Sequence, residues 1–236
     1  LKSMVFYANK RFDPDHKQYQ FEFFPDQKPG IKKFKSFSLR DGGNDFSDLY
    51  FRDLIIQRTM ASHVDLDWQA GHSAVLYING EYMGMLNIRE RSNEDNIYSN
   101  YDGLEDIDMV EISHEQVGGK DMFIEEIKGS NEDDTFYQAF KEFYSEKGHT
   151  KTEYEQWMDV SEYLNAMVMN LFYGNIDFPG NNLVFWRPND DDAESGLPKI
   201  WRVIVKDTDF GLGLYGKSND INTIDIIYHP EKHQAD

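Results

Sequence analysis

Alternating apolar and polar residues predict a β-hairpin in the first half of the chain. Residues 74–78 and 81–88 flank the dipeptide Asn79-Gly80, a sequence typical of a two-residue type I′ turn. Both turn positions need positive φ, which glycine and asparagine tolerate better than other residues. We therefore expect two antiparallel strands joined by a tight turn.

Residues 34–40 alternate in the same way and predict another strand. This strand should end at residues 41–44, where two glycines indicate a tight turn into a helix over residues 49–60. Residues 107–112 are mostly apolar and predict a further strand. Strands therefore dominate the first half of the predicted fold.

Helical periodicity is clearest in the second half, where apolar residues recur at helical spacing from residue 163 to residue 172. Asp159 and Glu162 precede this run with the spacing of a capping box, in which aspartate replaces the usual serine or threonine. Residues 135–144 also predict a helix, and so do residues 123–128. The second half should therefore be mainly helical.

Two short apolar runs, residues 183–187 and 200–205, follow the last predicted helix and are separated by a polar segment. They predict a second hairpin, with Trp186 and Trp201 facing each other across it. Strands and helices that are partly segregated along the chain indicate an α+β fold.

The change from strands to helices predicts a division of the chain into two parts. We place a β-rich part at residues 1–115 and a helical part at residues 116–236, with the boundary near the glycine pair at 118–119. Residues 1–8 have the pattern of a strand already in progress, and the chain stops shortly after its last motif. We therefore expect a fragment of a longer protein, incomplete at both ends and without a targeting segment in this part.

The candidate chemistry lies in two segments that follow these elements. Asp177 precedes Asn182 by five residues after the predicted helix, and Asp207 and Asp209 follow the last predicted strand in the sequence Lys-Asp-Thr-Asp-Phe-Gly. This spacing lets Asp177 face an attacking hydroxyl while Asn182 and Asp209 bind a magnesium ion. The order of the parts is typical of phosphoryl transfer from a nucleotide.

Each of these residues also has a purely structural interpretation. Asp177 and Asn182 are both of a type that commonly caps a turn after a helix. Asp207 and Asp209 would then be a solvated strand end, although two carboxylates one residue apart repel each other unless a cation lies beside them. The repulsion favours a metal ion at this place.

Several further motifs, taken in order with these two segments, resemble the spore-coat protein H (CotH) family of atypical secreted protein kinases. They lie at residues 39–45, 51–53, 77–84 and 87–91, so the resemblance covers nearly the whole chain. It implies a two-lobed kinase-like fold and the use of ATP with Mg²⁺ or Mn²⁺. It also implies phosphate transfer to hydroxyl side chains of secreted or surface proteins, and an extracellular or cell-surface location.

The resemblance also implies roles for individual residues. Asp177 matches the catalytic aspartate, and the metal ligands are Asn182, Asp209 and Asp207. Two residues would contribute to nucleotide binding: Lys2 as the phosphate-binding lysine, and Glu90 as its ion-pair partner or as a ligand of a second metal.

Composition restricts the class of partner. The chain has 236 residues, of which 39% are hydrophobic, so it can bury a substantial core in one or two domains. A net charge of -19 disfavours nucleic acid and anionic lipid as partners. The absence of cysteine excludes disulfides, thiolate zinc sites and cysteine nucleophiles, and the seven histidines show no metal-binding spacing. No apolar run approaches the roughly 20 residues that a membrane span needs.

Two other functions remain open. The chain can be a catalytically silent surface or coat module that keeps a kinase-like fold to bind a partner, or a metal-dependent phosphoesterase that uses the same carboxylates without ATP. The chain also has one dense basic cluster, which either steers phosphates or forms the solvated edge of a strand. Its members are Lys28, Lys32, Lys33 and Lys35.

Overall fold

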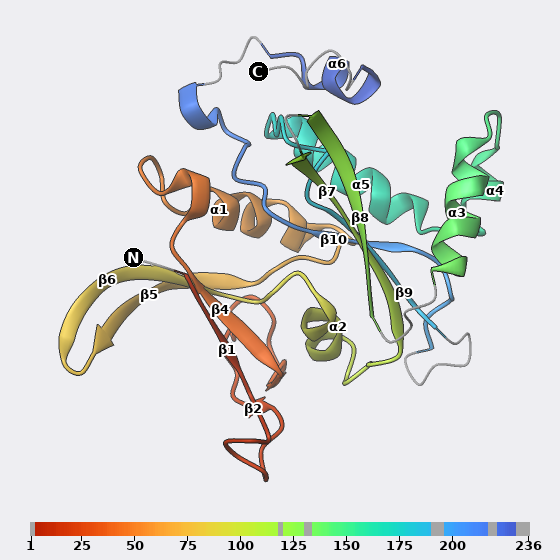
Figure 1. The fold of residues 1–236 in the computed structure, drawn as a ribbon. Helices are drawn as coiled ribbons and strands as arrows, with labels where there is room; N and C mark the ends of the chain where they lie inside the picture. Colours follow the sequence, from red (N-terminus) through yellow and green to blue (C-terminus); the bar gives the residue numbers. More distant parts are fainter. Residues whose placement is uncertain (1–2, 118–119, 130–133, 190–195, 217–220, 230–236) are drawn as a thin grey trace.

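The computed structural model describes residues 3–117, 120–129, 134–189, 196–216 and 221–229. It has an α+β fold with antiparallel sheets and several helices, as the sequence predicts (Figure 1). None of the helices in the described part of the chain is both long enough and apolar enough to cross a membrane.

The first sheet has four antiparallel strands in the order β1-β4-β6-β5. These are β1 (Met4–Tyr7), β4 (Ser36–Arg40), β6 (Glu81–Arg89) and β5 (Gly71–Ile78). The turn between β5 and β6 has φ of 52° at Asn79 and 83° at Gly80, so the predicted type I′ turn is confirmed. The hairpin projects from the rest of the molecule (Figure 1).

The first half of the chain also contains shorter elements. They are the strands β2 (Tyr19–Gln20) and β3 (Lys33–Phe34), the 3₁₀ turns η1 (Gly43–Asp45) and η2 (Ala61–His63), and the helices α1 (Arg52–Thr59) and α2 (Glu94–Asn100). The predicted turn into a helix is confirmed, because Gly42 and Gly43 both have positive φ between β4 and α1. This turn lies next to the site described below.

The second sheet has the order β10-β9-β7-β8 and is also antiparallel. Its strands are β7 (Ile107–Val117), β8 (Lys120–Gly129), β9 (Leu183–Pro188) and β10 (Arg202–Val205). The predicted hairpin of residues 183–187 and 200–205 is confirmed as β9 and β10.

The helix predicted for residues 123–128 is wrong, because these residues belong to β8. Ile124 and Ile127 are three residues apart, a spacing that a helix and a short strand can both contain. Pairing with β7 decides between them: Ile127 lies opposite Val110, and Lys128 bonds to Glu111 across the two strands. The long-range partner therefore overrides the local pattern.

The second sheet contains strands from both sides of the predicted division, and residue 115 itself lies within β7. The predicted boundary glycines at 118–119 lie outside the described residues. The division into parts 1–115 and 116–236 stays a prediction.

The remaining helices are α3 (Thr135–Ser145), α4 (Lys151–Tyr154), α5 (Val160–Phe172) and α6 (Thr223–Tyr228), with the 3₁₀ turn η3 (Leu214–Gly216).

The two tryptophans belong to different apolar clusters, Trp201 to the larger one with Phe140 and Trp186 to a smaller one with Ile97. The prediction that they face each other is wrong, because Trp186 lies opposite Arg202 and a shift of one residue reverses the face of a strand.

Candidate functional site

Helix α5 positions the first predicted segment. Asp159 caps the helix, since its carboxylate accepts a hydrogen bond from the Glu162 amide at 3.0 Å. The reciprocal bond of a capping box is replaced, because the Glu162 side chain accepts from the amide of Val203 instead. Gly174, with φ of 64°, follows the helix and starts the loop that carries Asp177.

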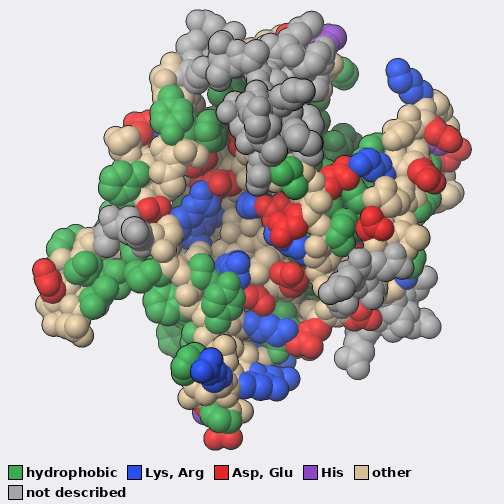
Figure 2. All heavy atoms as spheres, viewed as in Figure 1, with side chains coloured by type: hydrophobic (Ala, Val, Ile, Leu, Met, Phe, Trp, Pro, Cys, Tyr) green, Lys and Arg blue, Asp and Glu red, His purple; other side chains and the backbone are tan. Residues whose placement is uncertain are grey.

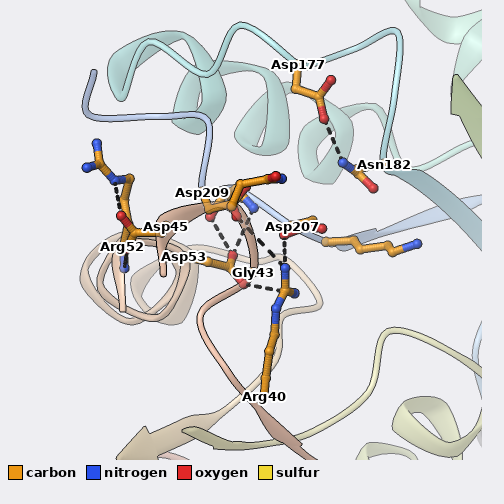
Figure 3. A network of polar contacts seen from close by, with 12 residues as sticks. Arg40, Gly43, Asp45, Arg52, Asp53, Asp177, Asn182, Asp207 and Asp209 are labelled. Atoms are coloured by element: carbon orange, nitrogen blue, oxygen red, sulfur yellow. Dashed lines mark hydrogen bonds and ion pairs between the residues drawn. The ribbon is translucent and has the colours of Figure 1, made fainter. Parts of the chain in front are cut away.

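Asp177 and Asn182 are brought together in this loop, as the sequence predicts. The side-chain amides of Asn181 and Asn182 both donate to Oδ2 of Asp177, each at 2.8 Å. The loop is anchored to β7, because Asn181 Oδ1 accepts from the His114 amide at 2.9 Å. Figure 3 shows the amide nitrogen of Asn182 directed at Asp177 and the amide oxygen directed away from it. Burial and the nearby charge of Asp207 raise the pKa of Asp177.

Strand β10 delivers the second segment, and Asp209 is its most unusual member. The residue is 1% exposed, and neither carboxylate oxygen has a hydrogen-bond partner. Burial, followed by the charges of Asp207 and Asp53, raises the pKa of Asp209 to about 7. A buried carboxylate without donors is costly unless a cation compensates it.

The cation that the structure places beside these carboxylates is Arg40, at the end of β4. Its Nη2 atom forms an ion pair with Asp207 and lies 4.0 Å from Oδ2 of Asp209, while Nη1 lies 3.7 Å from Oδ2 of Asp53 (Figure 3). Asp53 is buried, yet Arg89 and Arg40 hold its pKa far below the usual range. Asp53 also accepts from the backbone amide and hydroxyl of Thr208 at 2.9 and 2.7 Å, which ties α1 to the Asp207 segment.

Arg52 gives the same segment a second attachment. Its Nη1 atom donates to the carbonyl oxygens of Gly211 and Leu212 at 3.1 and 2.6 Å, and its Nε atom to Oδ1 of Asp45 at 3.1 Å. Both partners of the Arg52–Asp45 pair are buried. Helix α1 therefore holds the backbone immediately after Asp209.

Residues of the first half and the second half thus meet around Asp209. A sequence profile of the CotH kinase protein family matches residues 8–235 of the chain. The chain belongs to the CotH kinase family. No curated protein matches it.

The sequence alone gives no role to Arg40, Asp53 and Arg52. A signal was present, because they lie in the motif segments 39–45 and 51–53 that carry the resemblance to the CotH family. The part that these motifs play in the site depends on a long-range contact, because Arg40 bonds to Asp207 across 167 residues.

Glu90 of this CotH protein lies at the end of β6 and has a lysine partner. It is 1% exposed, and its Oε2 atom accepts from Lys28 Nζ at 2.6 Å and from the Ala70 amide at 2.9 Å. Its Oε1 atom accepts from Asn100 Nδ2 at 3.0 Å. Lys2, the partner expected from the resemblance, lies outside the described residues, so its role stays a prediction.

The basic cluster of the first half is divided among separate acidic partners. Lys28 pairs with Glu90, Lys33 with Asp102 at 2.9 Å, and Lys35 with Glu105 at 2.6 Å. Figure 2 shows Lys and Arg side chains interleaved with Asp and Glu side chains over the middle of the face that it presents. This arrangement favours the structural interpretation of the cluster over a free phosphate-binding patch.

The donor set at Asp209 fits a divalent cation. Within the described ranges, no three His, Cys, Asp or Glu side chains form a preassembled metal cluster. The two Asp209 oxygens are nevertheless buried without donors, which is the condition that a cation relieves. Carboxylate and amide oxygens are the ligands that Mg²⁺ prefers, so Asp209 and Asp207 with the amide oxygen of Asn182 form a suitable set.

Proposed function

We propose that this CotH protein transfers a phosphoryl group from ATP, with Mg²⁺ or Mn²⁺, to hydroxyl side chains of secreted or cell-surface proteins. The observation that carries the proposal is the buried carboxylate of Asp209, which has no hydrogen-bond donor. The charge of Asp207 raises the pKa of Asp209 and also the pKa of Asp177, so the predicted catalytic aspartate lies near the same carboxylate as the predicted metal ligand. Family membership supports a kinase-like activity.

Asp177 would orient the acceptor hydroxyl and accept its proton. Two amides hold Oδ2 of its carboxylate, which fixes the orientation of the group. Burial raises its pKa, and a carboxylate with a raised pKa is a stronger base than an exposed one. Phosphoryl transfer depends mostly on positioning and charge neutralisation, so a rigid acceptor site is what this loop has to provide.

Asp209 and Asp207, with Asn182, would hold the metal. A bound metal ion would neutralise charge on the transferred phosphate. Arg40 contributes a fixed positive charge beside Asp207 and Asp53, and Arg52 holds the backbone that follows Asp209. In this arrangement α1 and β4 act as supports for the ligands rather than as ligands themselves.

The second candidate is the catalytically silent module, and one observation favours it. Arg40 already neutralises Asp207 in this structure, so the acidic cluster has a counter-charge without any metal. A protein that had lost catalysis while keeping its fold would retain such a pair.

Paired substitutions in the full-length protein distinguish the two candidates. Asp209→Ala should abolish divalent-dependent ATP binding, because it removes the predicted anionic ligand. Asp177→Ala should keep metal-ATP affinity within a few-fold of wild type but reduce turnover by roughly a hundredfold or more, the scale of a lost catalytic base. ATP affinity is measured by calorimetry and phosphate incorporation into co-secreted proteins by radiolabel.

Asp26→Ala is the matched control, because Asp26 is an exposed aspartate whose partner is Arg58. It should leave both measurements unchanged, and thermal melts check the folding of all three variants. Wild-type phosphorylation in either site variant would remove the kinase assignment. Unchanged metal-ATP binding in Asp209→Ala would favour the silent module.

A further inference from the structure

Arg40 is the positively charged group that faces the predicted metal ligands. Its side chain extends from the end of β4 toward Asp207, with which Nη2 forms an ion pair (Figure 3). The same nitrogen lies 4.0 Å from Oδ2 of Asp209. A guanidinium group therefore stands beside both carboxylates to which a divalent cation would bind.

The other cations near this cluster are paired with other carboxylates. The pairs are Arg89 with Asp53, Arg52 with Asp45, and Lys206 with Glu111. Among these groups, Arg40 is therefore the counter-charge that remains for Asp207 and Asp209.

Accessibility sets Arg40 apart from the two other arginines. Its side chain is 25% exposed, whereas those of Arg52 and Arg89 are 2% and 3% exposed. A guanidinium that is partly open to solvent can contact a ligand, and its fork of N–H donors matches the oxygens of a phosphate group. Arg40 is thus the arginine of this cluster that a ligand can reach.

The fold holds the guanidinium of Arg40 in place. Its Nη1 atom lies 3.7 Å from Oδ2 of Asp53, and Asp53 is itself fixed by the bonds from Thr208. The backbone of Gly43 passes close by, because a Cβ atom at that position would lie 3.0 Å from Nη2 of Arg40. The positive charge is therefore kept beside Asp207 and Asp209 by its surroundings.

This fixed charge acts in opposite directions on the two expected ligands. A divalent cation at Asp207 and Asp209 is repelled by the guanidinium and has to share Asp207 with it. A phosphate group is attracted to the same guanidinium and receives hydrogen bonds from it. Negative phosphates beside the metal would offset the repulsion, so the two ligands favour each other.

We propose that Arg40 is a phosphate-binding residue that weakens the binding of free metal and strengthens the binding of nucleotide. The site then takes up the metal together with the nucleotide rather than ahead of it. The inference rests on the function proposed above for the identity of the phosphate ligand. It gives the first half of the chain a direct contact with the nucleotide at a site whose predicted metal ligands all come from the second half.

Three variants of the full-length protein test this role. Arg40→Gln removes the charge but keeps a side-chain donor for Asp207. Arg40→Lys keeps the charge but lacks the fork of donors. Arg58→Gln is the matched control, because Arg58 is an exposed arginine whose partner is Asp26.

Two affinities are measured by calorimetry at about pH 8. The first is that of Mn²⁺ without nucleotide, and the second is that of the non-hydrolysable ATP analogue AMP-PNP in EDTA, without metal. Arg40→Gln should bind Mn²⁺ about tenfold more tightly than wild type, because a repelling charge beside the ion is gone. The same variant should bind AMP-PNP about tenfold more weakly, because a charged hydrogen bond to phosphate is lost. Arg40→Lys should keep the Mn²⁺ affinity within a few-fold of wild type, and Arg58→Gln should keep both affinities.

The opposite signs distinguish a ligand contact from a purely structural role, because a variant that is only less well folded loses affinity for both ligands. Unchanged or weaker Mn²⁺ binding in Arg40→Gln overturns the inference, and so does AMP-PNP binding that is unchanged in the variant or absent in wild type. Where Arg40→Gln does not fold, the Nε–H signal of Arg40 in the NMR spectrum of wild type decides, assigned by its loss in Arg40→Lys. It should shift when AMP-PNP is added in EDTA, and an unchanged signal overturns the inference.

Phosphate transfer to co-secreted proteins, measured in the same preparations, separates this inference from the proposed function. If the two affinities shift in opposite directions but wild type transfers no phosphate, the kinase assignment fails while the role of Arg40 stands. If wild type transfers phosphate and Arg40→Gln leaves both affinities unchanged, the role of Arg40 fails while the kinase assignment stands.

Discussion

Arg52 and Arg58 provide an internal test of how α1 supports the candidate site. Both arginines lie on α1 and pair with an aspartate, Arg52 with Asp45 and Arg58 with Asp26. The Arg52 side chain is 2% exposed, whereas that of Arg58 is 49% exposed. The helix and the residue types are therefore matched. Arg52 differs in its burial and in its bonds to the carbonyl oxygens of Gly211 and Leu212.

Replacement of each arginine by methionine keeps most of the aliphatic packing and removes the charge. In Arg52→Met the buried Asp45 carboxylate loses its counter-charge, although it still accepts from the backbone amides of Leu49 and Arg52. The carbonyl of the buried Gly211 also loses its donor. Breaking a buried ion pair costs about 3–5 kcal/mol, so we expect a loss near 4 kcal/mol for Arg52→Met. Arg58→Met should cost less than about 1 kcal/mol.

Urea denaturation at pH 7 measures both free energies of unfolding, and thermal melts should show a decrease of about 10 °C for Arg52→Met. A double variant, Arg52→Met with Asp45→Asn, removes the uncompensated charge as well. It should recover about 1–3 kcal/mol relative to the sum of the two single losses. Equal losses for Arg52→Met and Arg58→Met would refute the reasoning, since burial would then have no effect on the pair.

Two further predictions concern other buried carboxylates. The pKa of Asp209 is raised to about 7 from an ordinary 3.8, so its folded form binds a proton more tightly and its contribution to stability falls as pH rises through 7. The free energy of unfolding of Asp209→Asn should therefore exceed that of wild type by about 2 kcal/mol at pH 8, after allowance for screening by solvent, and by almost nothing at pH 4. Urea titrations without divalent ions measure this difference. A difference that does not change with pH contradicts the prediction. Lys28→Met leaves Glu90 buried without its cation and should lower the free energy of unfolding by about 3 kcal/mol. Lys33→Met breaks an exposed pair and should lower it by less than about 1 kcal/mol. Equal losses in the same urea titrations would show that the Lys28 pair is no stronger than a surface pair.

Local signals predicted several of the turns and helices. The type I′ turn at Asn79-Gly80 depends on backbone angles that those two residues adopt easily, so neighbouring residues were enough to predict it. The helix after Asp159 follows from its cap and from apolar spacing. The Asp177 loop could be predicted too, because Asn182 reaches Asp177 across only five positions.

Periodicity was insufficient where one pattern suits two structures. Residues 123–128 contain apolar positions at helical spacing but lie in β8, because β7 offers a complete set of backbone partners. Trp186 and Trp201 lie on opposite faces because the register of β9 and β10 is shifted by one residue from the predicted alignment. Register depends on the packing of the whole sheet and not on either strand alone.

The sequence by itself determined the local turns and helices, the α+β class, the CotH resemblance and the short-range pair of Asp177 and Asn182. Tertiary structure alone decided which charges meet. Arg40 reaches Asp207 across 167 positions, and Lys28 reaches Glu90 across 62. Charges of either sign are spread along the chain, and nothing local indicates which aspartate will face which arginine. Burial selects the pairs, because a charge removed from water is stable only where the fold supplies its partner.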